Sequence, residues 1–217
     1  MAFNLKDYRL FIFDWDGTLA DSVSSIVESM QLAGSEIGET ISTADARYII
    51  GMGLEPAIHY LLPHLTDKKK MLKFIAVYKR EFLHRQTNIR FYPYAEQTIV
   101  QLHSMGKILA IATGKSRAGL TSALEHIHVG NYFTTTRTAD ETASKPDPKM
   151  LLEIMNECST SCQETIMIGD TTHDLLMARN AGIDCIGMTH GAHSIEALTE
   201  CEPLLLLNNF SEFLKIL

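Results

Sequence analysis

The segment Phe11-Ile12-Phe13-Asp14-Trp15-Asp16-Gly17-Thr18-Leu19 joins an apolar, strand-like run to two carboxylates and a glycine. Side chains at positions i and i+2 of a strand point to the same side, so Asp14 and Asp16 can reach one small volume where the strand ends. Two carboxylates held so close repel each other unless a cation lies between them or one takes up a proton. The segment therefore favours a metal site, acid–base chemistry, or both, although Asp-x-Asp-Gly alone is also compatible with a surface turn.

Length and composition are those of an ordinary soluble globular protein. The 217 residues are 46% hydrophobic and 21% charged, and the formal net charge of -7 argues against nucleic-acid binding. No apolar run approaches the ~20 residues that span a bilayer, so no membrane association is expected. The N-terminus has no signal-peptide form and the four cysteines make no zinc pattern, which predicts a cytoplasmic protein.

Strand-like and helical segments alternate in the second half of the chain. Strands are predicted over residues 107–112, 165–169, 184–188 and 203–207, with one helix running through His126 and another ending near Gly182. This alternation predicts an α/β fold with a doubly wound, Rossmann-like parallel sheet. Sheets of this kind place ligands beyond the carboxyl ends of their strands, where the polar motifs of this chain occur.

Residues 20–91 interrupt this rhythm with a helical block. Its last helix carries apolar residues at helical spacing, Met71, Ile75, Tyr78 and Phe82, and Thr66 is its expected N-cap. We therefore predict an α/β core domain made of residues 1–19 and 92–217, with an inserted helical domain at 20–91.

The polar motifs suit phosphoryl transfer, which needs positioning and neutralisation of charge. Asp14 is a candidate carboxylate nucleophile, and Asp16 is a candidate to protonate the leaving oxygen and later activate water. Mg²⁺ usually takes one or two protein carboxylates, and Asp14 and Asp170 are the expected ligands. Asp174, four residues further along a helix, either takes part in the metal site or caps that helix.

Other residues are candidates to hold the phosphoryl oxygens. Thr113 follows a strand with a free hydroxyl, and the amide of Gly114 can approach a phosphate closely because it has no side chain. Lys145 lies in the loop Ser144-Lys145-Pro146-Asp147-Pro148, which two prolines stiffen, and supplies a point cation. Lys115, next to Gly114, is expected to face solvent or to add positive potential to the pocket.

Four motifs in this order resemble the haloacid dehalogenase superfamily. They are Asp14-Trp15-Asp16-Gly17-Thr18, Thr113-Gly114, Lys145-Pro146, and Gly169-Asp170 with Asp174. The resemblance implies that Asp14 is the nucleophile, Asp16 the acid–base, and Thr113 and Lys145 the phosphate ligands. It also implies a Mg²⁺ ion held by Asp14, Asp170 and the backbone carbonyl of Asp16, and it makes the helical insertion a type 1 cap.

Two further segments are similar to phosphoglycolate-phosphatase-like members of this family, namely residues 47–54 and Thr189-His190-Gly191. This similarity implies a small phosphorylated metabolite as substrate. Arg47 either binds a substrate carboxylate or is a surface charge. Trp15 is included with Gly114 and Arg47 among the substrate-binding candidates, although packing beside the carboxylates is its simpler role.

Several activities fit the same motifs. Asp16 argues against a dehalogenase, whose motif lacks this second carboxylate. A phosphomutase similar to β-phosphoglucomutase, or a pyrophosphatase, would use the same residues, and a non-catalytic protein that binds a phosphorylated metabolite is a further alternative. The sequence leaves open whether the protein is a monomer or a homodimer.

Overall fold

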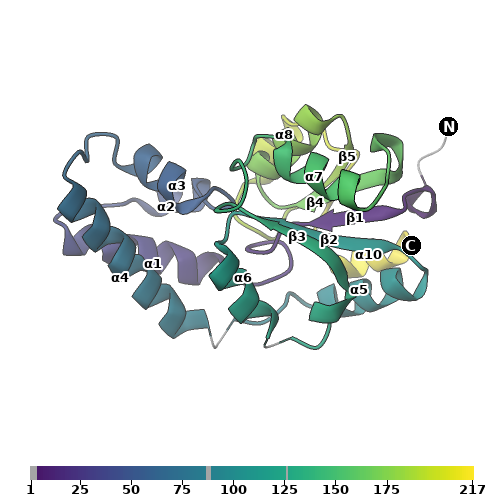
Figure 1. The fold of residues 1–217 in the computed structure, drawn as a ribbon, viewed down its shortest axis with the longest axis horizontal. Coiled ribbons are helices and arrows are strands. Elements are labelled where there is room, and N and C mark those ends of the chain that lie inside the picture. Colours follow the sequence, from purple (N-terminus) through teal and green to yellow (C-terminus); the bar gives the residue numbers. More distant parts are fainter. Residues whose placement is uncertain (1–3, 87–88, 126) are drawn as a thin grey trace.

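The computed structural model describes residues 4–86, 89–125 and 127–217. Figure 1 shows a sheet flanked by helices at one end of the molecule, which also holds the C-terminus, and a group of helices at the other end. The chain passes from the sheet to this helical group directly after the first strand and returns before the second.

A six-stranded parallel sheet forms the first part. Its strands are β1 (Leu10–Phe13), β2 (Ile108–Thr113), β3 (Phe133–Thr138), β4 (Thr165–Gly169), β5 (Asp184–Met188) and β6 (Leu205–Leu207). They lie in the order β3-β2-β1-β4-β5-β6, and every neighbouring pair is parallel. The order reverses at β1, as in a doubly wound fold, so the predicted fold class is confirmed.

Helices cover both faces of the sheet. One face carries α5 (Ala95–Ser104), α6 (Arg117–Leu124) and α10 (Phe210–Lys215), and the other carries α7 (Lys149–Glu157), α8 (Thr172–Ala181) and α9 (Ile195–Thr199). Short 3-10 helices occur at Leu5–Asp7, Gly130–Tyr132 and Cys162–Glu164. Successive residues of β1 alternate between the faces: Phe11 and Phe13 pack on the first, and Leu10 and Ile12 on the second. Both faces of the central strand are therefore buried, which explains its continuous apolar run.

Most strand predictions are confirmed within one or two residues. The main omission is β3, because its Thr-rich sequence at the sheet edge lacks the apolar run of a central strand. The helix predicted to run through His126 ends at Leu124, and His126 itself lies outside the described residues. The helix predicted to end near Gly182 does so, since Gly182 has a φ of 69° and caps α8.

The helical group consists of α1 (Val23–Glu36), α2 (Thr43–Tyr48), α3 (Leu54–Leu61) and α4 (Lys68–Gln86). These helices share a hydrophobic core of their own, separate from the two beside the sheet. Thr66 was the wrong cap for α4, because Asp67 Oδ1 accepts the hydrogen bond from Lys69 N at 2.8 Å. The two segments that connect the helical group to the sheet lie side by side, because Ala20 in the first and Phe91 in the second form a β-bridge. Within the described residues, no helix combines the length and apolarity needed to cross a membrane.

Candidate active site

Three adjacent strands bring the predicted residues to one edge of the sheet. Asp14 follows β1, Thr113 ends β2 and Asp170 follows β4, and all three side chains are buried. The Asp14 amide donates to the Ile168 carbonyl at 2.9 Å, which extends the pairing of β1 and β4 to the first residue of the motif. The carboxyl ends of β1, β2 and β4 therefore form the floor of one site, as the alternation of elements predicts.

Lys145 lies between two carboxylates at this floor. Its Nζ is 2.7 Å from Asp14 Oδ1 and 2.6 Å from Asp174 Oδ1, and its side chain is 0% exposed. Burial lowers the pKa of Lys145, but the two carboxylates outweigh burial and raise it above its usual range. The ammonium therefore remains charged and provides a fixed cation beside Asp14.

Asp174 is held by groups of the protein on both oxygens. Its Oδ2 accepts hydrogen bonds from the amide and the hydroxyl of Thr171, and its Oδ1 accepts one from Lys145. Thr171 in turn accepts from the Asp174 amide, which completes a capping box at the start of α8. The helix-capping role considered for Asp174 is therefore observed in this structure.

The Asp170 carboxylate is closely surrounded by other groups of the protein. Its Oδ1 accepts from Thr18 Oγ1 at 2.5 Å and its Oδ2 from the Ala192 amide at 2.7 Å. A Cβ atom at Gly17, where φ is +85°, would lie 2.2 Å from Asp170 Oδ2, and one at Gly191 would lie 2.1 Å from the same atom. Both positions thus need glycine because the backbone approaches the carboxylate so closely.

The carboxylates of Asp14, Asp170 and Asp174 fit a divalent cation. One oxygen from each can be chosen so that all three lie within 4.8 Å of one another, and Asp14 Oδ2 is buried without a hydrogen-bond partner among the described residues. Burial raises the pKa of Asp14 well above its usual range despite Lys145, and burial together with Asp174 raises the pKa of Asp170 to about 7. A hard cation would relieve this crowding of negative charge.

Asp16 is engaged by a different lysine. Lys115 Nζ lies 3.0 Å from Asp16 Oδ1 and 2.9 Å from Oδ2, and Ser22 Oγ donates to Oδ1 at 2.7 Å. The Lys115 ammonium also lies 4.4 Å from the centre of the Phe82 ring, on α4. Lys115 is therefore not a solvent-facing residue, since its side chain is only 7% exposed.

Gly114 lies where the helical group approaches the sheet. A Cβ atom there would be 2.5 Å from the backbone oxygens of both Gly51 and Met52. Nearby, the Gly53 amide donates to Ser144 Oγ at 2.8 Å. The segment 51–53 thus passes directly over the end of β2, and glycine at position 114 makes room for it.

The structure does not bring Arg47 into the site cavity. Its Nε donates to the Ala192 carbonyl at 3.0 Å and its Nη2 to the Gly191 carbonyl at 2.7 Å. The adjacent Tyr48 carbonyl accepts from His173 and His193, at 2.7 and 3.0 Å. Arg47 thus joins α2 to the loop after β5 through donors on its Nε and Nη2 atoms.

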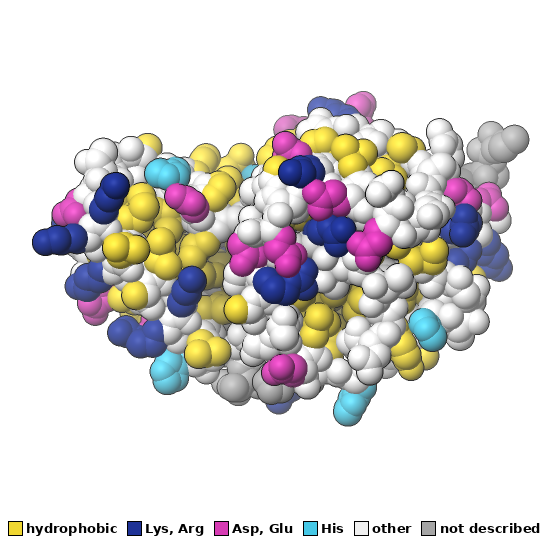
Figure 2. Space-filling model, viewed as in Figure 1, with side chains coloured by type: hydrophobic (Ala, Val, Ile, Leu, Met, Phe, Trp, Pro, Cys, Tyr) yellow, Lys and Arg dark blue, Asp and Glu magenta, His cyan; other side chains and the backbone are white. Residues whose placement is uncertain are grey.

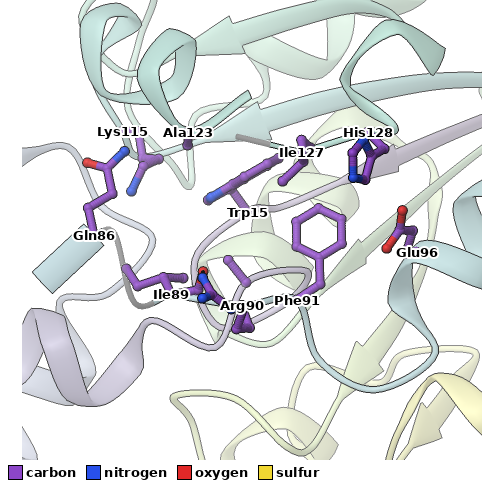
Figure 3. A pocket seen from close by; sticks show the side chains of 11 residues that line it. Trp15, Gln86, Ile89, Arg90, Phe91, Glu96, Lys115, Ala123, Ile127 and His128 are labelled. Atoms are coloured by element: carbon purple, nitrogen blue, oxygen red, sulfur yellow. The ribbon is translucent and has the colours of Figure 1, made fainter. Parts of the chain in front are cut away.

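Trp15 also lies away from the main cavity. Its buried ring packs edge-on against Phe91, with 5.4 Å between the ring centres. It lines a separate cavity of about 300 Å³, shown in Figure 3, where Gln86 and Lys115 lie at one end and Glu96 and His128 at the other. This arrangement agrees with the packing role expected for Trp15.

A cavity of about 1020 Å³ opens over the carboxylates. Asp14, Asp16, Thr113 and Gly114 lie on its floor, and residues of the helical group form its walls. The apolar wall residues of the helical group come from α1, from the segment 49–57 and from α4, and they include Ile26, Met30, Ile49, Ile50, Met52, Leu54, Pro56, Ala57, Met71, Leu72, Ile75, Tyr78, Phe82 and Leu83. The cavity therefore joins a charged floor to a largely apolar upper part.

Sequence reasoning missed several contacts of this site. Thr18 and Ser22 bind Asp170 and Asp16, yet their sequence positions carry no signal beyond nearness to the first motif. The pairing of Lys115 with Asp16 spans 99 residues and depends on how β2 lies beside β1. The apolar stripe on α4 was visible as a pattern, but nothing in the sequence showed which surface it would face.

Comparison with known proteins gives consistent matches. Residues 11–188 match the family model described as haloacid dehalogenase-like hydrolase. The chain is 34% identical over 209 residues to "Probable phosphatase IndB" of Dickeya dadantii, which covers 94% of this chain and 90% of that protein. It is 28% identical to a phosphoglycolate phosphatase of Vibrio cholerae, with 98% of each chain covered. A crystal structure from Bacteroides fragilis, described as a haloacid dehalogenase-like hydrolase, superposes with a TM-score of 0.86 at 26% identity, covering 95% of this chain and 99% of that one.

Proposed function

The chain belongs to the haloacid dehalogenase-like hydrolases and is a phosphatase, and on this premise we propose that it hydrolyses a small phosphomonoester through an aspartyl-phosphate on Asp14. The observation that carries this proposal is the position of Asp14. Its carboxylate lines the floor of the cavity, one oxygen is paired with Lys145 at 2.7 Å, and the other has no hydrogen-bond partner among the described residues. A carboxylate with one oxygen held and one oxygen unengaged is suited to attack.

The proposed reaction has two steps. Asp14 attacks phosphorus, the bond from phosphorus to the ester oxygen breaks, and Asp16 donates a proton to the leaving oxygen. Asp16 then takes a proton from water, which attacks the aspartyl-phosphate, releases inorganic phosphate and restores Asp14. Thr113 and the Gly114 amide bind the phosphoryl oxygens, while Lys145 holds Asp14 and balances its charge.

Mg²⁺ is general in this family, and the carboxylate cluster fits it. We assign Asp14, Asp170 and the backbone carbonyl of Asp16 as its ligands in this chain. When bound, the ion supplies positive charge to the phosphoryl oxygens and allows Asp14 to remain ionised. Asp174, the third carboxylate of the cluster, holds Lys145 and the start of α8 through the hydrogen bonds that its two oxygens accept.

We assign residues 20–91 to a cap domain and residues 1–19 and 92–217 to the catalytic core. The separate hydrophobic core of α1–α4 supports this division, and so do the two chain crossings that meet at Ala20 and Phe91. A cap of this kind excludes water and contributes contacts to the substrate. We expect the substrate to be a small phosphorylated metabolite and the enzyme to be cytoplasmic.

The proposed function can be tested by phosphate release and by trapping the intermediate. Purified protein with Mg²⁺ is mixed with phosphoglycolate, pyrophosphate, sugar phosphates, nucleotides and p-nitrophenyl phosphate, and inorganic phosphate is measured. A labelled substrate quenched with acid should leave phosphate bound to the protein, and hydroxylamine should remove it, as expected for an acyl phosphate. An isomerised substrate without free phosphate would indicate a phosphomutase instead, and no product from any substrate would contradict the proposal.

The carboxylate cluster also predicts a pH-dependent stability of the Mg²⁺-free protein. The pKa of Asp170 is raised to about 7, against about 3.9 when unfolded, so between these values the folded state holds a proton that the unfolded state has lost. The free energy of unfolding therefore falls as pH rises through this window, by up to about 1.4 kcal/mol per pH unit for each such proton. Two buried histidines, His173 and His193, and the partly buried His190 act in the opposite direction, because burial lowers their pKa.

The contribution of Asp170 is isolated by comparing wild type with Asp170→Asn. In EDTA, the melting temperature of wild type is expected to fall relative to that of Asp170→Asn between pH 5 and pH 8, since the histidines are common to both proteins. Mg²⁺ should raise the melting temperature of wild type more at pH 8 than at pH 5, and that of Asp170→Asn much less at either pH. If the melting temperatures of the two proteins changed in parallel with pH, Asp170 would not be the source of the pH dependence.

A further inference from the structure

We infer that the ester group of the substrate is an apolar alkyl or aryl group of several carbon atoms, not a short acid such as glycolate. This inference rests on the proposed phosphatase function and names the class of molecule that its site takes. The large cavity over Asp14 carries it, because the phosphoryl group must lie on the floor of this cavity and the ester group must extend into its upper part.

One broad apolar face of the helix α4 serves both the core of the helical group and the cavity. Phe74 and Val77 are buried in the hydrophobic core of the helical group, where α4 packs on α1. Beside them on the same face, four residues are only partly buried against this core and also line the cavity: Met71, Ile75, Tyr78 and Phe82. Because these four side chains are only partly buried, they leave apolar surface open to the cavity.

Other parts of the wall are also apolar. Met30 comes from α1, and Met52 and Leu54 come from the segment that leads into α3. The cavity of about 1020 Å³ lies at the upper end of the range of about 300–1,000 Å³ that is usual for small-molecule sites. A glycolate group would leave most of this apolar surface in contact with water, whereas a larger apolar group would cover it.

Among the described residues that line the cavity, no buried cation is left to pair with a carboxylate of the substrate. The cavity lining includes three cations, Lys68, Lys79 and Lys115. Lys115 is paired with Asp16, and the other two are exposed on α4. Arg47, the expected partner of such a carboxylate, donates instead to backbone carbonyls outside the cavity.

The mouth of the cavity continues this apolar surface outward. Leu72 and Leu83 line it and are 66% and 62% exposed. Figure 2 shows hydrophobic side chains gathered over the end of the molecule that carries α3 and α4. Because this surface is continuous with the cavity that holds Asp14, the structure assigns it to the ester group of the substrate.

A series of n-alkyl phosphates tests the inference directly. Their leaving alcohols have similar basicity, so differences in kcat/KM report on binding of the alkyl group. Each methylene from methyl to hexyl phosphate should raise kcat/KM about three- to four-fold, or about 10²–10³ over the series, and phosphoglycolate should fall well below hexyl phosphate. Ile75→Gln should flatten the series, while Leu152→Gln, an exposed leucine on α7 outside the cavity, should leave it unchanged.

If Ile75→Gln fails to fold, the exposed Leu72→Gln gives the same test at the cavity mouth, with the loss confined to the longest esters. A flat alkyl series, or phosphoglycolate favoured over every alkyl ester, would overturn the inference and leave the phosphatase assignment intact. Absence of phosphate release from all esters, including p-nitrophenyl phosphate, would overturn the proposed function itself. The two failures are therefore distinguishable in one assay.

Discussion

The Asp14→Asn protein is expected to fold normally and to release phosphate at least about 10⁴-fold more slowly than wild type. An amide cannot take the place of the carboxylate as a nucleophile, so no aspartyl-phosphate can form. Asparagine has nearly the same shape and can still accept from Lys145, which lies 2.7 Å from Asp14 Oδ1. The measurement is steady-state phosphate release together with trapping of labelled phosphate on the protein.

The melting temperature separates this catalytic effect from a structural one. Burial and the neighbouring carboxylates Asp170 and Asp174 raise the pKa of Asp14, so a neutral amide relieves repulsion in the metal-free protein. We therefore expect Asp14→Asn to melt at or above the wild-type temperature in EDTA. Asp7→Asn, an exposed aspartate far from the site in the fold, serves as the matched control and should retain full activity. Substantial turnover by well-folded Asp14→Asn would refute the nucleophile assignment.

Of the substitutions proposed, Lys145→Met is expected to lower the free energy of unfolding the most. Lys145 is fully buried and lies within 2.7 Å of both Asp14 and Asp174, so its removal leaves the carboxylates without a compensating charge. Removing one partner of a buried ion pair typically costs about 3–5 kcal/mol of unfolding free energy. Methionine keeps an unbranched apolar stem only one atom shorter than the lysine side chain, so this cost reports on charge more than on packing.

The pH dependence of this loss identifies its cause. Without Lys145 the pKa of the buried carboxylates should rise further, so the destabilisation should be larger at pH 8 than at pH 5, where protons replace the lost ammonium. Urea unfolding in EDTA at both pH values measures it, and Lys149→Met, an exposed lysine at the start of α7, is the control. Equal stability of Lys145→Met and wild type at pH 8 would show that the lysine does not compensate the cluster.

The fold was largely predictable because its signals are local. The apolar run of β1 is continuous because both faces of this strand are buried, and the glycine that ends α8 has a φ of 69° that favours glycine. β3 was not predicted, because an edge strand rich in threonine shows no apolar run. Element type thus followed from hydrophobic pattern wherever burial was strong on both sides.

The candidate site was predictable only in part. The positions of Asp14, Thr113 and Asp170 follow from one rule, that polar residues at the carboxyl ends of adjacent parallel strands converge. The sequence did not show which lysine pairs with which carboxylate, because Lys145 and Lys115 are separated from their partners by long stretches of chain. Asp14 and Asp16 line the same cavity, as their spacing predicted, yet they are paired with different lysines.

The sequence by itself determined the parallel α/β sheet, the helical insertion and the strand ends that carry the carboxylates, because these depend on periodicity and on residues adjacent in the chain. Only the tertiary structure decided that Arg47 joins α2 to the loop after β5 and that the partly buried side of the apolar face of α4 lines the cavity. An amphipathic pattern specifies that a face is apolar, but not what covers it. The packing of α1–α4 leaves this face turned toward Asp14, and that arrangement arises from contacts between segments far apart in the chain.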